Sequence, residues 1–326
     1  MGQPSNPTDT ATLASAVSAI SDARSVALAC HVNPDGDALG SMLGLFHVLK
    51  AAGRDVVASF SNPFVVAPHY RELPGLDLLT VPEDFPTEPE VMVTFDCGSL
   101  NRLGDLEPAA KAARQLIVID HHISNDRYGT INLVEPDAAA SGWVVLRLVD
   151  ELRLALNHEA AVCLYAALVC DTGRFQYDTT TPEVFDMARR LTEYDVPVSQ
   201  LSRTLFEEHR FAYLKLLAEA LENAELVREQ RFVWTAITQE MLHRHDVSME
   251  EIEGLIDILR RASEAEVTCV LKEEEDGNVR VSLRSLGDTD VCRIAEAHGG
   301  GGHRFAAGFT SELDIPTVVA RIRAAL

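Results

Sequence analysis

Short apolar runs alternate with longer stretches of helical spacing through the first part of the chain. The runs SVALAC, VMVTFD and QLIVID are continuously apolar, and each is short enough for a buried strand. Apolar strands that alternate with helices are typical of a parallel α/β sheet. The strands that we expect lie at 25–30, 55–61, 91–96 and 115–120, and the helices between them at 37–53 and near 105–114.

Helical patterns dominate the middle of the chain, and a second block of strands and helices begins near residue 231. The helices that we expect cover 141–173 as a pair, 181–194, and a polar segment over 196–227. The later block contains a strand RFVWTAIT, a helix over 249–262, a hairpin over 267–284, a helix from 290, a glycine cluster and a final helix. We therefore expect two domains, 1–195 and 229–326, joined by a helical linker over 196–228.

Composition narrows the class of protein. The 326 residues carry a net charge of −22, which opposes binding to long nucleic acid because that affinity comes mainly from cationic contacts to phosphates. The six cysteines form no CxxC pair, so we expect buried thiols in a reducing cytoplasm. No secretory signal or membrane span is indicated, and we expect the polar residues 1–10 to be disordered.

Residues of the types that bind metals follow the ends of three predicted strands and one predicted helix. Ligands bind at the carboxyl ends of parallel strands in open α/β sheets. Each residue alone has a structural alternative: Asp35 and Asp37 also fit a helix N-cap, and single strand-end aspartates and core histidines are common. Their joint occurrence favours a site. The residues are His31, Asp35, Asp37, Asp96, Asp120, His121, His122 and Asp171.

The spacing of this set suits two metal ions. Asp35 and Asp37 flank Gly36 and can point to opposite sides of a tight turn, so each can serve a different ion. Mixed Asp/His sets suit Mn²⁺ or related divalent ions, whereas thiolate sets favour zinc. Two ions about 3.5–4 Å apart can bind a bridging hydroxide and stabilise the attacking and leaving oxygen atoms at phosphorus.

The segments that carry these residues resemble the four successive motifs of the DHH phosphoesterase superfamily. They are HVNPDGDALGS, VTFDCGSLNRLG, VIDHHISN and VCDTGRFQYDTT. In addition, VSLRS and IAEAHGGGGHRFAAG resemble the DHHA1 domain. The resemblance is strongest to the nanoRNase/pAp phosphatase branch, which includes cyclic dinucleotide phosphodiesterases. It implies an α/β fold in which a helical linker joins an N-terminal parallel-sheet DHH domain to a smaller α/β DHHA1 domain.

The resemblance implies roles for the residues at matching positions. One Mn²⁺ would be held by His31, Asp35 and Asp96. The other would be held by Asp37, Asp96, His121 and Asp171, so that Asp96 bridges the two ions. Asp120 would orient an imidazole, and His122 would face the scissile phosphate. Arg102 is a candidate phosphate contact, with a helix-start salt bridge as the alternative.

The glycine cluster is a candidate anion site. Four consecutive glycines before His303 let backbone N–H groups approach an anion, although flexible loops have the same composition. A guanidinium such as that of Arg284 can grip a phosphate through two bonds. With the resemblance, the substrate-binding set becomes Arg284, Ser285, Gly300, Gly301, Gly302 and His303.

The expected activity is hydrolysis of short nucleotides by two Mn²⁺ ions and a bridging hydroxide. The substrates implied are RNAs of two to five nucleotides, pAp, and linear or cyclic dinucleotides such as pApA and c-di-AMP. The alternatives are a RecJ-like single-strand exonuclease, a pyrophosphatase or polyphosphatase, and a nucleotide sensor without turnover. Long nucleic acid and membranes are not expected as partners, and a homodimer is compatible with this branch.

Overall fold

The computed structural model describes residues 10–326 and divides the chain into two compact units. Unit 1 comprises the residues up to 205 except 67–69, and unit 2 comprises 67–69 and 206–326. Of the residues 1–10 for which we expected disorder, 1–9 lie outside the described residues, whereas Thr10 is the first residue of helix α1, Thr10–Asp22. Within 10–326, no helix is both long enough and apolar enough to cross a membrane, and all six cysteines are free thiols.

Unit 1 contains a five-stranded, wholly parallel sheet with the order β2-β1-β3-β4-β5. The strands are β1 Ser25–Cys30, β2 Asp55–Ser59, β3 Val91–Phe95, β4 Gln115–Asp120 and β5 Ile131–Val134. The predicted α/β fold is confirmed. The sequence did not predict β5, because its four residues are too few for a recognisable apolar run and half of them are only partly buried.

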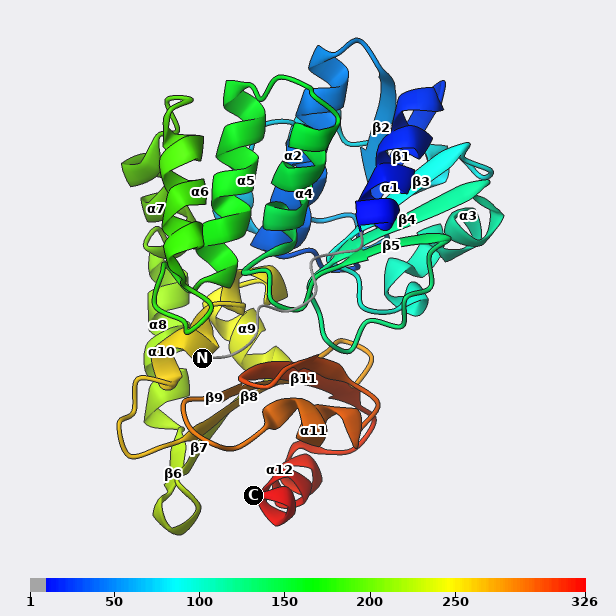
Figure 1. Cartoon of the computed structure of the whole chain (residues 1–326). Helices are drawn as coiled ribbons and strands as arrows, with labels where there is room; N and C mark the ends of the chain where they lie inside the picture. The colour runs from blue at the N-terminus through cyan, green and yellow to red at the C-terminus, as the bar shows by residue number, and fades with distance from the viewer. Residues whose placement is uncertain (1–9) are drawn as a thin grey trace. The chain divides into compact units, whose positions relative to one another are not determined.

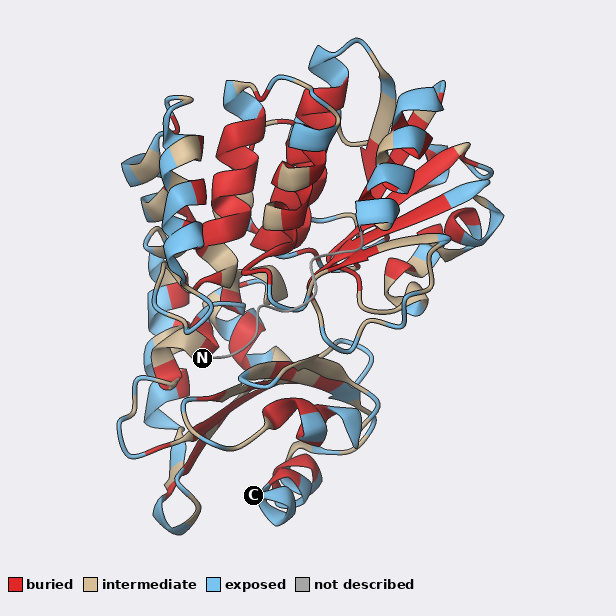
Figure 2. Cartoon of the chain, in the orientation of Figure 1, coloured by how far each residue is buried: buried red, intermediate tan, exposed pale blue. Residues whose placement is uncertain are grey.

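Helices cover both faces of this sheet (Figure 1). The helices of unit 1 are α1 Thr10–Asp22, α2 Gly36–Ala51, α3 Glu107–Ala112, α4 Ser141–Glu151, α5 His158–Asp171, α6 Pro182–Thr192 and α7 Val198–Phe206. Figure 2 shows that α2 and α5 are buried on nearly all sides, as are the central strands. The helix expected near 105–114 is present as the shorter α3, and a 3₁₀ segment, Leu100–Leu106, precedes it. Gly104 interrupts the 3₁₀ segment with a φ of 53°.

The close approach of α2 to α5 depends on glycine and gives a stability prediction. A Cβ atom added at Gly40 would lie 2.4 Å from the carbonyl oxygen of Cys163 and 2.9 Å from the Cβ of Ala167. We therefore expect Gly40→Ala to lower the free energy of unfolding by about 1–3 kcal/mol, measured by urea denaturation. Gly254→Ala is the control, since nothing lies within 4 Å of its added Cβ. Equal stability of the two variants would contradict the packing described.

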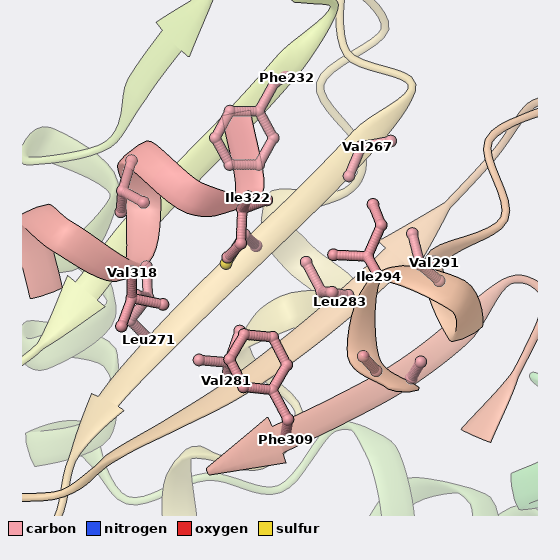
Figure 3. Packing of buried hydrophobic residues seen from close by; sticks show 14 of the residues in the cluster. Phe232, Val267, Leu271, Val281, Leu283, Val291, Ile294, Phe309, Val318 and Ile322 are labelled. Carbon is pink, nitrogen blue, oxygen red and sulfur yellow. The ribbon is translucent and has the colours of Figure 1, made fainter. Parts of the chain in front are cut away.

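Unit 2 contains a six-stranded mixed sheet with the order β10-β11-β9-β8-β7-β6. Its strands are β6 Glu225–Val227, β7 Phe232–Ile237, β8 Val267–Glu273, β9 Val279–Ser285, β10 Gly301–His303 and β11 Ala306–Ser311. One face packs against α11 Val291–Glu296 and α12 Ile315–Ala325 (Figure 3). The other face packs against α8 Phe211–Glu222, α9 Gln239–His245 and α10 Leu255–Leu259.

Two local predictions for this half of the chain differ from the structure. The helical pattern over 196–227 is divided into α7, α8 and the short strand β6. The helix expected over 249–262 is shorter: a 3₁₀ turn, Met249–Ile252, precedes α10, which ends at Leu259. The last two glycines of the glycine cluster lie in strand β10.

Candidate metal centre and active site

The candidate residues of unit 1 gather at the carboxyl ends of β1, β3 and β4. In the order β2-β1-β3-β4-β5, β2 lies on one side of β1 and β3 lies on the other, so the direction in which successive strands are added reverses at β1. Open parallel sheets bind ligands at such a switch point, outside the strand ends. His31 directly follows β1, Asp96 directly follows β3, and Asp120 is the last residue of β4.

Asp35 caps helix α2 with one carboxylate oxygen and faces His31 with the other. Its Oδ1 accepts hydrogen bonds from the backbone N–H groups of Asp37 and Ala38, at 3.1 and 3.0 Å, and so caps α2. Its Oδ2 lies 3.9 Å from His31 Nε2. The side chain of Asp35 is 54% exposed while that of His31 is 4% exposed, so Asp35 marks the side on which this group of residues meets solvent.

Asp96 stands at the centre of the cluster in an uncommon backbone conformation. Its φ is 51°, which costs energy for a residue other than glycine and often marks a functional site. Its two carboxylate oxygens face different histidines. Oδ2 lies 3.5 Å from His31 Nε2, and Oδ1 lies 3.5 Å from His121 Nε2. Asp96 therefore belongs to two groups of potential ligands at once.

Asp37 and Asp171 complete the group on the His121 side. His121 Nε2 lies 2.9 Å from Asp171 Oδ2 and 3.7 Å from Asp37 Oδ2. Asp37 is fully buried at the start of α2, and Asp171 is the last residue of α5. The structure thus brings together Asp37, Asp96, His121 and Asp171, the set that the resemblance placed around one ion.

The ring orientations of His31 and His121 are fixed by contacts of Nδ1 with backbone carbonyl oxygens. His31 Nδ1 lies 2.8 Å from the carbonyl oxygen of Val32, and His121 Nδ1 lies 3.0 Å from that of Ala138. A carbonyl can only accept, so each Nδ1 carries a proton, and Nε2 of each ring faces the carboxylates. Histidines that ligate metals are held in this way.

The carboxylates and the Nε2 lone pairs of the facing histidines repel one another unless a proton or a cation lies between them. The carboxylates therefore raise the pKa of a facing imidazole, and a facing imidazole lowers the pKa of a carboxylate. Burial lowers the pKa of His121, but Asp171, Asp37 and Asp96 raise it well above its usual value. Burial raises the pKa of Asp96, but the facing imidazoles hold it well below the usual range. The chemistry of the donor set therefore fits divalent cations.

Asp120 acts on the neighbouring loop. Its Oδ1 accepts from the backbone N–H groups of His121 and His122, at 2.7 and 3.1 Å, and from His122 Nδ1 at 2.7 Å. Its Oδ2 accepts from the amide of Asn125. Asp120 therefore fixes the orientation of the His122 ring through Nδ1.

The comparisons with known proteins identify the family. Residues 25–168 match the DHH family, N-terminal domain, and residues 232–326 match the DHHA1 domain. The chain is 31% identical, over 90% of its length and 87% of the relative's, to the bifunctional oligoribonuclease and PAP phosphatase NrnA of Thermus thermophilus. The chain belongs to the DHH family. It is therefore a DHH phosphoesterase, a hydrolase of phosphoric esters, and the family that its motifs resembled is confirmed.

Two further comparisons agree with this assignment. The NrnA protein of Bacillus subtilis is 29% identical over 85% of this chain and 86% of its own length. An exopolyphosphatase-related protein from Bacteroides fragilis has the same fold, with a TM-score of 0.86, 23% identity and coverage of 97% of this chain and 95% of its own. The order of a DHH domain followed by a DHHA1 domain is confirmed.

Two residues of this DHH centre were missed by the sequence reasoning. Asn125 donates to Asp120 and to the carbonyl oxygen of Cys97, and so fixes the loop that carries both histidines. Ser141, at the start of α4, donates from Oγ to Asp96 Oδ1 at 3.1 Å. Asn125 lies within the VIDHHISN motif and could have been noticed. Ser141 lies in no motif that we considered.

Arg102 lies in the 3₁₀ segment after β3, and its side chain is half-buried. Its carbonyl oxygen accepts from the backbone N–H of Val32 at 2.9 Å, which ties this segment to the loop after His31. Its guanidinium lowers the pKa of the Cys97 thiol, but burial prevails and raises that pKa to about 11. The contact of Arg102 with phosphate stays a prediction.

In unit 2, the candidate residues occupy two strands and both faces of the sheet. Side chains alternate between faces along β9, and burial alternates with them. Arg284 is half-buried, whereas Ser285 is buried at 2% exposure on the opposite face. Ser282, which the sequence did not single out, therefore lies on the same face as Arg284, and the contact of Ser285 with substrate stays a prediction.

The glycines before His303 are not equivalent. A Cβ at Gly300 would lie 2.1 Å from the carbonyl oxygen of Gly308, and Gly302 has a φ of 140°, so both are required by the pairing of β10 with β11. An added Cβ at Gly301 would have nothing within 4 Å. His303, which ends β10, pairs with Ala306 of β11. Gly301 is therefore the glycine that leaves open space beside this edge strand.

The electrostatics of the centre predict that metal binding depends on pH. Burial, together with Asp96 and Asp171, raises the pKa of Asp37 well above its usual value, and the pKa of His121 is also raised. A divalent ion has to displace these protons. We therefore expect the affinity for divalent cations to increase as the pH rises, because the raised pKa values make protons on Asp37 and His121 compete with the ion to a higher pH than in the free side chains. Calorimetric titrations in two buffers of different ionisation enthalpy would count the protons, and binding without proton release would contradict the prediction.

Proposed function

We propose that this DHH enzyme hydrolyses short nucleotides, namely pAp, oligoribonucleotides of a few residues, and linear or cyclic dinucleotides, with two Mn²⁺ ions. The observation that carries the proposal is the position of Asp96, whose two oxygens face two separate groups of potential ligands. A second observation is that the relatives of highest identity reported above are named as oligoribonuclease and PAP phosphatase.

Each side chain of the centre has a defined task in this proposal. His31, Asp35 and Asp96 hold one ion, and Asp37, Asp96, His121 and Asp171 hold the other. When bound, the pair of ions supplies an acidified water and neutralises charge at phosphorus. Asp120 keeps the proton of His122 on Nδ1, so that in the imidazolium form Nε2 donates to an oxygen of the scissile phosphate.

The proposed role of unit 2 is to hold the part of the substrate that does not react. Arg284 supplies a guanidinium, His303 supplies an imidazole, and Gly301 leaves room for an anion beside β10. We also propose the division into a catalytic domain over 1–195, a helical linker over 196–228 and a substrate-binding domain over 229–326. The strongly acidic chain disfavours long strands as substrates.

The direct test is release of AMP from pApA by the full chain with Mn²⁺. Rates on pAp, a labelled RNA trinucleotide and c-di-AMP, measured side by side, would rank the substrates. Pyrophosphate and a long 5′-labelled single strand test the rival activities. Faster turnover of either rival than of every short nucleotide would overturn the proposal, and tight binding of pApA without product would indicate a nucleotide sensor.

The proposed division of labour predicts a specific effect of Arg284→Ala. Loss of a charged hydrogen bond costs about 1.5–3 kcal/mol, so we expect KM for pApA to rise about 10- to 100-fold while kcat changes little. Calorimetry should still show two Mn²⁺ ions per chain. Arg228→Ala is the matched control, because this arginine of unit 2 lies in the 3₁₀ turn after β6 with its side chain 71% exposed and belongs to no predicted site, and we expect its KM to stay near that of the unmodified enzyme. Loss of metal from Arg284→Ala would contradict the assignment.

A further inference from the structure

We propose that Ser141 is a positioning residue of the two-metal centre, which holds the ligands Asp37 and Asp96 in register with each other. The inference rests on the proposed function, because it assumes that these carboxylates bind metal. Ser141 is fully buried at the first position of α4. Two of its groups, the backbone N–H and the side-chain hydroxyl, reach two different carboxylates.

The first contact comes from the helix terminus. The N-terminal N–H groups of a helix need acceptors, which a capping side chain usually provides. The capping position of α4 is Ala140, which has no such side chain. The backbone N–H groups of Ser141 and Gly142 donate instead to Asp37, at 2.6 Å to Oδ2 and 3.0 Å to Oδ1. The carboxylate of Asp37, supplied by α2, therefore caps α4.

The second contact comes from the hydroxyl. Ser141 Oγ donates to Asp96 Oδ1 at 3.1 Å, and this is the oxygen that faces His121. Asp96 follows β3 and Asp37 begins α2, so the two carboxylates come from separate elements and Ser141 links them directly. The hydroxyl fixes the plane of the Asp96 carboxylate and hence the directions in which its oxygens can bind the two ions.

A purely structural role for Ser141 makes a different prediction. Asp37 accepts from three donors: the backbone N–H groups of Ser141 and Gly142, and Ser41 Oγ at 2.9 Å. Removal of the Ser141 hydroxyl would leave all three in place. The hydroxyl of Ser141 thus acts on Asp96, and its loss should affect metal binding more than folding. If it served only to satisfy a buried group, its loss would lower stability and leave metal affinity unchanged.

The experiment compares Ser141→Ala with Ser59→Ala in the full chain. Ser59 is an equally buried serine, on β2, whose hydroxyl donates to the carbonyl oxygen of Phe60 and to no residue of the centre. Mn²⁺ affinity and stoichiometry are measured by calorimetry, the coupling between the two ions by electron paramagnetic resonance, and stability by thermal unfolding in EDTA. Steady-state kinetics on pApA separate kcat from KM.

We expect Ser141→Ala to bind Mn²⁺ about 10- to 100-fold more weakly, the range found when residues that support metal ligands are replaced. The coupling signal should change, kcat should fall and KM for pApA should stay within about twofold. Ser59→Ala should keep the affinity of the unmodified enzyme. Unchanged affinity and coupling in Ser141→Ala would overturn the inference alone. An unmodified enzyme that binds fewer than two ions would overturn the proposed function as well.

Discussion

Asp96→Asn is expected to lower metal-dependent hydrolysis of pApA by at least about 10³-fold. Asparagine keeps the size of the side chain but replaces one of the two oxygens that face His31 and His121 with an amide nitrogen that cannot bind a cation. Metal ions contribute several kcal/mol of charge stabilisation in the transition state, and each 1.4 kcal/mol corresponds to about tenfold in rate. The measurement is the single-turnover rate at saturating Mn²⁺, together with the number of ions bound per chain.

The matched control for this prediction is Asp55→Asn. Asp55 is exposed at the first residue of β2, at the amino end of the sheet, and takes no part in the centre. Its replacement should leave the rate and the metal content unchanged. Full activity of Asp96→Asn with two bound ions would remove Asp96 from the role of shared ligand.

His122→Gln is expected to lower kcat about 10²- to 10³-fold while both ions stay bound. This is the effect found when one preorganised donor to a developing charge is removed. Burial lowers the pKa of His122, but Asp96 and Asp120 raise it above its usual value, and the contact of Nδ1 with Asp120 favours the imidazolium form. The activity should therefore fall as the pH rises through this raised pKa, and the variant should lack that fall.

Asp120→Asn tests how the contact between Asp120 and His122 affects the pKa of His122. Because Asp120 contacts His122 Nδ1 at 2.7 Å, an amide at this position should lower the pKa of His122 and move the alkaline fall in activity to lower pH. Metal affinity of His122→Gln is the second readout. A large loss of metal from that variant would show that His122 is a ligand instead of a group that contacts substrate.

Much of unit 1 could be predicted from its sequence because its strands are buried on both faces. β1, β3 and β4 are continuously apolar, and their lengths agree with the prediction to within a residue. The grouping of the site residues also followed from the sequence, since parallel strands bring their carboxyl ends to one edge. β5 lacked such a signal, as did β10, whose glycines match a loop as well as a strand.

The contacts that depend on packing between distant segments could not be predicted. Ser141 reaches Asp96 across 45 positions of sequence, and its backbone reaches Asp37 across 104. No periodicity or motif encodes such a contact. That Ser282 shares the face of Arg284, and Ser285 does not, could have been predicted from the sequence, because the alternation of side chains along a strand places 282 and 284 on one face.

In the proposed centre, the carboxylate of Asp96 is shared by two cations. The decisive measurement is a crystal structure of the full chain grown with Mn²⁺, with data collected at the manganese absorption edge. We expect two anomalous peaks about 3.5–4 Å apart on either side of Asp96, one beside His31 and the other beside His121. A single peak, or peaks that do not contact Asp96, would contradict the proposed centre.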